Sequence, residues 1–438
     1  MHAHLHGTAP PPPTTAAKVL VAVTVVVGVL TAVGLVALWP RGEAPDTGAD
    51  LSGLSWVDAT VTAVDRGQCP TFEMMVPSPC DIVSVDVTSG PTAGERAVLF
   101  VADIDFAVPD LAVGDGVILQ YNPLAPPEFR YTFFEFQRTT PLVALALLFA
   151  VVVIALGRWR GVRALLGLGV TGMVLLVFLL PSLLRANPPI LVALTAAALI
   201  AMAALYLAHG VTLDTTVALV GALAALTITT GLAALFVALT QLSGLAGADA
   251  QLLRVSAEAL DPAGVLIAGI VIGALGVLDD VTVTQVATVA ELRAVGPRLS
   301  NAELYRRALR VGRDHIASTV NTLVLAYAGA SLALLVFFVQ SEQPLGRTIG
   351  REIVATEIVR ALVGGIGLVA AVPISTGLAV LVRPPVPDAA TAAGPSDPDR
   401  PGTDRPDPDR PDPDRGHDHD ETGAHRPPSW DDFAPDDP

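Results

Sequence analysis

The sequence predicts an all-α polytopic membrane bundle of about eight transmembrane helices, with a small extracytoplasmic all-β domain, OB-like in its strand pattern, between helices 1 and 2. Two observations predict this fold class. Of the 438 residues, 52% are hydrophobic and only 16% are charged, whereas a soluble chain carries about a quarter charged residues. Long charge-free stretches also alternate with short arginine-bearing ones, which is the pattern of a multi-span membrane protein.

The chain opens with a segment, 1–18, that we expect to be disordered and cytoplasmic because it is rich in His and Pro. The apolar run 19–39 follows, and at about 1.5 Å per residue it is long enough to cross the hydrocarbon layer. A secretory signal peptide is the alternative, but its apolar region is about 7–15 residues long and ends at small cleavage residues. We therefore predict a transmembrane anchor.

Residues 50–138 are the part of the sequence that reads as a folded domain outside the membrane. Val83, Val85 and Val87 alternate with polar residues, as in a half-buried strand. Similar short runs occur at 56–64, 97–104, 117–121 and 131–136, between Gly and Pro turns. Five short strands indicate a small barrel or sandwich.

The two cysteines of the chain, Cys69 and Cys80, both lie in this expected β domain. If the domain is outside the cytosol, they can pair in a disulfide that closes a short loop. Two unpaired buried thiols are the alternative.

The segment 141–382 is expected to be a seven-helix membrane domain. The predicted spans are 141–157, 163–184, 190–209, 214–239, 263–290, 316–339 and 359–382. Arginines collect in the connections after the second and the sixth of the eight predicted helices, and the positive-inside rule then puts both termini in the cytosol. The same rule places the β domain outside the plasma membrane.

The tail 383–438 carries most of the net charge of −16. Residues 384–438 hold 15 Asp/Glu and 5 Arg, a balance of −10 that leaves −6 for the rest of the chain. A Pro/Asp/Arg-rich segment of this kind cannot bury a core, and we expect it to be a disordered cytoplasmic tail. The absence of a strongly basic domain argues against nucleic acid as a partner.

Two adjacent acids, Asp279 and Asp280, interrupt the apolar run 263–290. On a helix, Asp280 and Thr284 share one face with Glu291, and Asp279 points elsewhere. A buried aspartate pair is costly when ionised, so these residues predict a proton relay or a cation site. The alternative is a pair at the cytosolic interface that bonds helix ends or a nearby arginine. Whether 263–290 is one helix or two half-helices stays open at this point.

A second polar cluster, at 314–322, opens the following span. His315 and Thr319 fall on one helical face, with Asn321 close by. His315 is a candidate partner for an aspartate of the preceding span, which would give a group that titrates near neutral pH. The alternative is a histidine at the membrane boundary, beside hydroxyls that bond their own helix backbone.

Enzymatic chemistry is not expected from this sequence. Val283 stands where an Asp-Asp-x-x-Asp metal motif needs an acid, and Leu278 stands where a Gly-x-Gly-Asp protease motif needs glycine. The chain has no Gly-x-Ser-x-Gly, phosphate-loop or His-Glu-x-x-His motif. We therefore expect no catalytic residue, no cofactor and no metal centre.

Two long motifs carry a resemblance to a known family. The run Leu-Asp-Asp-Val-Thr-Val-Thr-Gln at 278–285 and the run Arg-Asp-His-Ile-Ala-Ser-Thr-Val-Asn-Thr-Leu at 313–323 resemble the YibE/F-like family of bacterial multi-pass membrane proteins. The similarity is expected to cover residues 55–382 and to leave out both termini. It implies a permease-like membrane architecture without an assigned substrate, and it carries over no catalytic residues.

Two functional hypotheses follow. The first is a plasma-membrane permease for a small solute or ion, with a polar pathway lined by Asp279, Asp280, Thr284, Gln285, Thr288, His315, Thr319 and Asn321. The second is a non-transporting membrane scaffold or sensor, whose β domain binds an envelope protein. The expected partners are the lipid bilayer, the unknown solute or ion, such an envelope protein and other copies of the chain.

Overall fold

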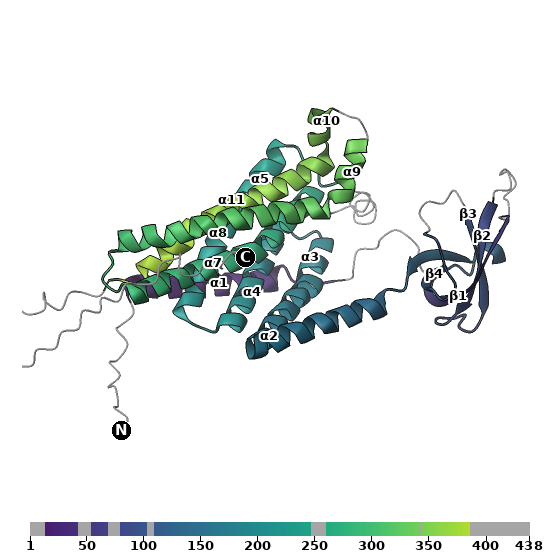
Figure 1. Ribbon diagram of the computed structural model, residues 1–438, viewed down its shortest axis with the longest axis horizontal. Coiled ribbons are helices and arrows are strands. Elements are labelled where there is room, and N and C mark those ends of the chain that lie inside the picture. The colour runs from purple at the N-terminus through teal and green to yellow at the C-terminus, as the bar shows by residue number, and fades with distance from the viewer. Residues whose placement is uncertain are drawn as a thin grey trace, which may run out of the picture. The chain divides into compact units, whose positions relative to one another are not determined.

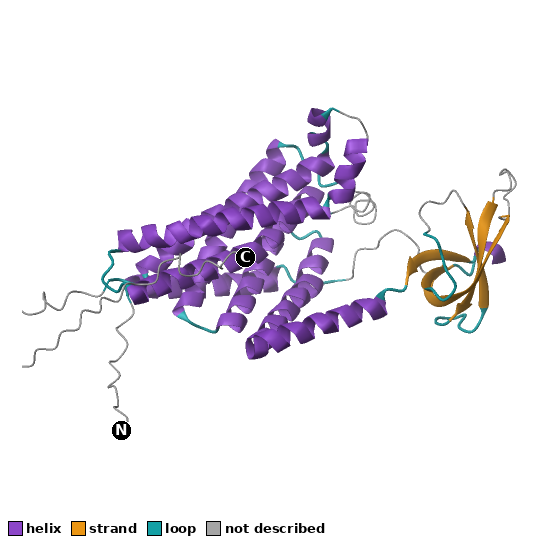
Figure 2. Cartoon of the chain, viewed as in Figure 1, coloured by secondary structure: helices purple, strands orange, loops and turns teal. Residues whose placement is uncertain are grey.

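The computed structural model describes residues 14–42, 54–68, 79–102, 109–246, 260–340 and 344–385. These residues form a helical bundle and a small β domain, each with a hydrophobic core of its own (Figures 1 and 2). Most of the two expected disordered termini, 1–18 and 383–438, lies outside the described residues.

Helix α1 spans Thr15–Ala37 and occupies the predicted anchor. It begins before residue 19, because the Thr14 side chain accepts a hydrogen bond from the Ala17 amide at 3.2 Å and so caps the helix. Residues 15–18 are therefore helical, contrary to the expected disorder. At the other end, the Leu38 carbonyl accepts hydrogen bonds from Ser182 Oγ at 2.8 Å and Asn187 Nδ2 at 3.2 Å.

The β domain contains the five predicted strands. They are β1 (Ser55–Gln68), β2 (Pro79–Val87), β3 (Arg96–Ala102), β4 (Gly116–Tyr121) and β5 (Tyr131–Phe136), with the short 3-10 helix η1 (Pro127–Phe129) before the last. All neighbours are antiparallel, in the order β3-β2-β1-β4-β5. Alternate valines of β1 and β2 form much of the core, as the period of two predicts. The Tyr131 hydroxyl of β5 donates to the Glu95 carboxylate at 3.3 Å, which links opposite edges of the sheet.

The predicted disulfide falls partly outside the described residues. Cys80 on β2 is fully buried and disulfide-bonded. Cys69, the other cysteine of the chain, belongs to the segment that the structure does not describe, so the pairing of the two stays a prediction.

A single run of helical turns covers the second and third predicted spans. It comprises α2 (Thr139–Met173), the π-helical turn η2 (Val174–Leu179) and α3 (Leu180–Leu184). Arg158 breaks this run, because its φ of 50° and ψ of −130° are not helical. Gly161 lies at the same break, where a Cβ atom would come within 2.3 Å of the Val153 carbonyl oxygen. The ribbon of α2 accordingly bends sharply between its ends (Figure 1).

The remaining helices complete the bundle. They are α4 (Pro189–His209), α5 (Leu213–Leu239), α7 (Pro262–Val295), α8 (Asn301–Ala330), α9 (Leu332–Gln340), α10 (Leu345–Ile349) and α11 (Glu352–Leu381). Helix α7 runs without interruption for 34 residues, so the two-half-helix alternative does not apply. Ser300 caps the start of helix α8, because its Oγ accepts a hydrogen bond from the Glu303 amide at 3.2 Å.

Six helices of the described chain are long and apolar enough to cross a membrane. A seventh crossing is added if α8 and α9, which meet at a 65° bend, make one span. This finding indicates a multi-span helical membrane protein. It is a coarser result than the eight spans that the sequence predicts.

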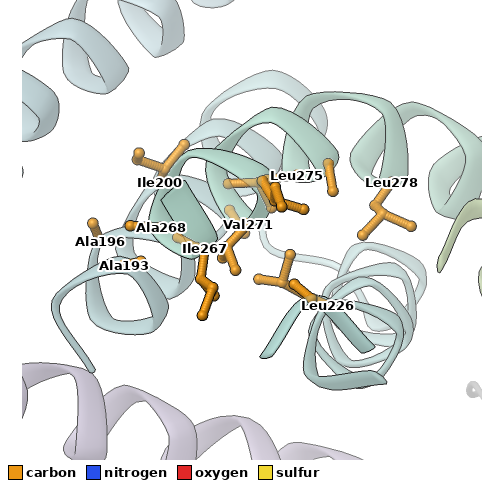
Figure 3. Close-up of a cluster of buried hydrophobic side chains, with 14 of the residues drawn as sticks. Ala193, Ala196, Ile200, Leu226, Ile267, Ala268, Val271, Leu275 and Leu278 are labelled. Atoms are coloured by element: carbon orange, nitrogen blue, oxygen red, sulfur yellow. The ribbon is translucent and has the colours of Figure 1, made fainter. Parts of the chain in front are cut away.

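Helices α5, α7 and α11 pack together at the centre of the bundle, with α4 against α7. Small residues allow the close approach of α4, because Ala193 and Ala196 lie beside Ile267 and Ala268 of α7 (Figure 3). Larger side chains then fill the space toward α5, where Leu226 lies close to Leu275 and Leu278 (Figure 3).

One end of the bundle gathers the starts of α1, α5 and α8 and the ends of α7 and α11. A second hydrophobic cluster joins them, and it contains Ala17, Val217, Val289, Leu304 and Val380. An ion pair between Asp214 and Arg383 closes the same end. We refer to it as the terminal end, because both described termini lie there.

Candidate functional site

The face of α7 that other helices leave uncovered is built from small and polar residues. At helical spacing along it lie Gly269, Gly273, Gly276, Asp280, Thr284, Ala287 and Glu291, all of them exposed. We call this set the α7 stripe. The buried face of the same helix is mostly apolar, with Ile270, Leu278 and Val281 almost fully enclosed.

Other outward faces of the bundle are chemically different. Helix α1 exposes valines such as Val25 and Val29, and α2 exposes Leu145, Leu148 and Val151. Such side chains suit contact with lipid. The α7 stripe offers lipid almost no large apolar side chain, and its charged and hydroxyl groups lie toward the Glu291 half.

Asp279 and Asp280 point in different directions, as their helical spacing predicts. Asp280 is exposed on the stripe, whereas Asp279 is half-buried at its edge. The Oδ1 atom of Asp279 is buried and has no hydrogen-bond partner among the described residues. An ionised oxygen in such surroundings is costly, so Asp279 needs a proton, a cation or a water molecule to satisfy it.

The threonines around the aspartates differ in what their hydroxyls do. Thr282 and Thr288 donate to backbone carbonyls one turn earlier, Thr282 to Asp279 at 3.1 Å and Thr288 to Thr284 at 2.9 Å. Thr284 is exposed on the stripe, one turn from Asp280. Of the predicted residues on α7, Asp280 and Thr284 therefore share the accessible surface, and Thr288 lies at its margin.

Gln285 is placed inside the bundle and not on the stripe. Its side chain is 3% exposed. Its Nε2 atom donates to the Ala308 carbonyl of α8 at 3.0 Å and to Thr376 Oγ1 of α11 at 2.8 Å. The amide thus joins three helices, which is a structural role in place of the predicted lining role.

Helix α8 runs antiparallel beside α7. The register follows from two contacts, because Gln285 meets Ala308, and a Cβ atom on Gly273 would lie 3.4 Å from the Tyr327 hydroxyl. The level of Asp279 on α7 therefore corresponds to the stretch of α8 around Thr319.

The predicted residues of α8 are brought to this level but are not bonded to the aspartates. His315 is half-buried, and its Nε2 atom has no hydrogen-bond partner among the described residues. Thr319 donates to the His315 carbonyl at 2.9 Å, and Asn321 is exposed. Within the described chain, no ion pair or hydrogen bond joins His315 to Asp279 or Asp280.

A comparison with known protein families identifies the chain. The model of the YibE/F-like protein family matches residues 145–384, which is more than half of the sequence. The chain belongs to the YibE/F-like family. No curated protein and no solved structure matches it.

The match to the YibE/F-like family begins inside α2. It therefore omits α1 and the β domain, although the motifs in the sequence predicted similarity from residue 55. The α7 stripe and the polar part of α8 both lie inside the matched region. The bundle is the part of the molecule that family membership describes.

Buried hydroxyls that the sequence did not predict lie between α5 and α11 of this YibE/F-like protein. Thr229 and Ser375 are fully enclosed. A Cβ atom on Gly367 would come within 2.0 Å of Thr229 Oγ1, and one on Gly221 within 2.6 Å of Ser375 Oγ. Each hydroxyl thus fills the space that a glycine of the facing helix leaves. A glycine in one helix does not show which residue of another helix lies opposite it, so these pairs could not be predicted from the sequence.

No cluster of three or more His, Cys, Asp or Glu side chains that could hold a metal ion occurs among the described residues. The chemistry that the site can perform with its own groups is proton exchange at Asp279 and Asp280 and oxygen coordination by these carboxylates and Thr284. Both suit the passage of a proton, a cation or a small polar solute.

Proposed function

We propose that this YibE/F-like protein is a permease of the bacterial plasma membrane, and that it moves a small solute or ion along the α7 stripe. The observation that carries the proposal is the chemistry of that exposed face. The exposed face of α7 carries glycines, Asp280, Thr284 and Glu291, whereas the exposed faces of α1 and α2 carry valine and leucine. No catalytic step is part of the proposal.

The carboxylates give the pathway its selectivity in this proposal. Asp280 faces the stripe directly, and Asp279 lies beside it with a buried oxygen that has no partner in the described chain. A half-buried acid next to a second, exposed acid favours a bound proton or a bound cation. Thr284 adds a hydroxyl oxygen one turn away.

The proposal includes eight membrane crossings with both termini in the cytosol. The break at Arg158 divides the long helical run into two lengths, which match the predicted spans 141–157 and 163–184. The bent pair α8 and α9 then forms one crossing. Four arginines lie near the terminal end of the bundle: Arg160, Arg163, Arg306 and Arg310. Their positions agree with a cytosolic terminal end.

Water access to the stripe tests the proposal without knowledge of the substrate. Single cysteines at Gly276, Asp280 and Thr284 should react with a small membrane-impermeant thiol reagent in intact vesicles. Matched cysteines at Val25 and Leu362, which are exposed on α1 and α11, should not react. Equal protection at all five positions would show that the stripe faces lipid or protein, and the pathway would be ruled out.

Flux provides the second test. Proteoliposomes that contain a trapped pH-sensitive dye report proton movement under an imposed potassium diffusion potential. The double variant Asp279→Asn/Asp280→Asn should insert normally, and its proton flux should be at least about tenfold lower than that of the wild type. The reason is that neutral amides neither carry a proton nor attract a cation. Asp314→Asn, which changes an exposed acid of α8, is the control. Wild-type flux in the double variant would exclude the carboxylates as pathway groups.

One observation favours the alternative of a scaffold or sensor. In the β domain, Trp56 is 46% exposed and Phe134 is 54% exposed. Their rings stack edge to face with centroids 6.0 Å apart. Exposed aromatic pairs of this kind are common at protein interfaces, so this surface is the candidate contact for an envelope protein.

Deletion of residues 50–138 distinguishes the two functions. A permease whose pathway lies in the bundle should keep its flux without the β domain. A scaffold should lose its partner and its cellular role, and Trp56→Ala with Phe134→Ala should reproduce that loss in the full-length chain.

A further inference from the structure

A cavity of about 440 Å³ lies at the end of the bundle opposite the terminal end. The starts of α7 and α11 and the segment that follows α5 enclose it. Its apolar walls include Leu260, Pro262, Val265, Leu266 and Ile353. Its volume is within the range of pockets that hold small organic molecules.

The polar groups of the cavity come from one stretch of α11. Thr356 and Arg360 are one helical turn apart and so share a face, and Glu357 lies between them in the sequence. Arg360 Nη1 donates to both Glu357 carboxylate oxygens, at 3.0 and 3.2 Å. This pair holds the guanidinium in place at the wall.

Two hydrogen-bond donors of the cavity are left without a protein acceptor. The Nε atom of Arg360 and the Oγ1 atom of Thr356 are both buried, and neither has a partner among the described residues. The Thr356 side chain belongs to a residue that is only 9% exposed. Buried donors without an acceptor are costly, and here both belong to the lining of a cavity large enough for a ligand.

We propose that this cavity binds a small amphiphilic carboxylate. One carboxylate group accepts hydrogen bonds from Arg360 Nε and Thr356 Oγ1, and the apolar body of the molecule packs against Leu266, Val265 and Ile353. An anion is favoured over a cation, because Arg360 Nε can only donate and belongs to a positively charged group, and the Thr356 hydroxyl can donate beside it. The Glu357 oxygens already accept from Arg360. The neighbouring Glu357 disfavours a doubly charged anion, which selects a carboxylate over a phosphate dianion.

The proposal concerns binding and does not depend on transport by the α7 stripe. Gly269 is the point of contact between the two features, since it lines the cavity and begins the stripe. A bound carboxylate would therefore lie at the Gly269 end of the stripe, away from the aspartates.

Binding of decanoate to the full-length protein in nanodiscs is the direct test. Calorimetry should show saturable binding above that of empty nanodiscs, with one site per chain. Decanol and decylammonium, which have the same chain but no carboxylate, should bind at least about tenfold more weakly. Equal binding of all three compounds, or no saturable binding of decanoate, would overturn the proposal.

Three variants test the donors. Thr356→Val keeps the shape of the side chain and removes the hydroxyl, so decanoate affinity should fall about tenfold. The double variant Glu357→Gln/Arg360→Gln removes both charges together, leaves no unpaired charge, and should lower affinity about a hundredfold. Thr227→Val, at an exposed threonine of α5 that bonds its own helix, should bind as the wild type does. Unchanged affinity in the first two variants would refute the assigned contacts.

Obstruction of the cavity provides a test that does not alter the polar groups. A Cβ atom on Gly269 or on Gly276 would meet no other atom within 4 Å, so a side chain can begin at either position without a clash at its Cβ. Gly269→Leu projects into the cavity and should abolish decanoate binding. Gly276→Leu, on the same stripe but outside the cavity lining, should not. Equal binding by the two variants would place the ligand elsewhere.

Discussion

At the scale of single residues, the bundle depends on polar side chains that are buried between helices. Gln285 is the clearest case, because one amide nitrogen reaches the Ala308 carbonyl of α8 and the Thr376 hydroxyl of α11. Thr376 in turn donates to the Val372 carbonyl at 2.7 Å. A membrane interior offers no water to replace such contacts, so the chain of hydrogen bonds fixes how α7, α8 and α11 meet.

We expect Gln285→Leu to lower the free energy of unfolding by about 1–2 kcal/mol, since interhelical hydrogen bonds in membranes contribute roughly this much or less. Thermal denaturation of the purified protein in detergent measures the effect as a lower Tm. Thr288→Val is the matched control, because the Thr288 hydroxyl bonds only its own helix. Equal Tm values for both variants and the wild type would mean that Gln285 has no stabilising role.

The same residues show what sequence reasoning could and could not find. The direction of Asp280 and Thr284 follows from helical periodicity, and the structure places them on one exposed face as expected. Gln285 is one residue from Thr284 and was grouped with it, although it points into the bundle. The pattern along one helix gives the angles between its side chains. It does not show which side chains face other helices, because that depends on where α8 and α11 pack.

At the scale of elements, glycines decide how closely helices approach. The antiparallel pair α5 and α11 uses two of them in a reciprocal way, with Gly221 opposite Ser375 and Gly367 opposite Thr229. Each helix supplies one glycine and one hydroxyl-bearing residue. The interface is therefore specified by both sequences together, and neither sequence alone reveals it.

Gly367→Ala should destabilise the bundle by about 1–3 kcal/mol, the usual cost of overpacking a core, because the new methyl group would overlap Thr229 Oγ1. Gly365→Ala is the control on the same helix, where a Cβ atom would meet nothing within 4 Å. Adding Thr229→Ala to Gly367→Ala should restore part of the lost Tm. If Gly367→Ala and Gly365→Ala have the same Tm, the close approach of α5 and α11 is refuted.

The break in α2 is a second element whose origin is a glycine. Gly161→Ala should disturb the turn at Arg158, because its methyl group would meet the Val153 backbone oxygen, which cannot move aside as a side chain can. Gly157→Ala, four residues earlier in open space, should have little effect. Limited proteolysis at the turn, together with Tm, would separate the two variants. Identical cleavage and Tm for both would remove this explanation of the break.

The elements were predicted more accurately than their contacts. Five strands and most helices lie close to their predicted positions, because alternation with a period of two and long apolar runs are local signals. Helix α8 differs from the predicted span 316–339, because it begins at Asn301 and ends at Ala330. The arginines at 306, 310 and 313 argue against a position inside the membrane, but a charged stretch does not interrupt a helix.

At the scale of the whole molecule, the arrangement of helix ends constrains the topology. Ala17 at the start of α1 and Val380 at the end of α11 belong to the same hydrophobic cluster. The Glu352 carboxylate, at the start of α11, accepts from the Ser243 and Gly244 amides at 2.7 and 2.8 Å, beyond the end of α5. Both described termini therefore leave the bundle at one end, and the 240–246 segment lies at the other.

Reporter fusions should reveal this sidedness in cells. Green fluorescent protein, which matures in the cytosol, should fluoresce when it is fused after Pro385 or before Thr14, because the arginine-rich terminal end is the side that the positive-inside rule retains. Alkaline phosphatase, which is active only outside, should be active when it is inserted after Ser243 and inactive after Arg383. A phosphatase signal at Arg383 would invert the orientation. If the reporters placed the two termini on opposite sides of the membrane, the hydrophobic cluster shared by α1 and α11 would be contradicted. The even number of crossings would then be wrong as well.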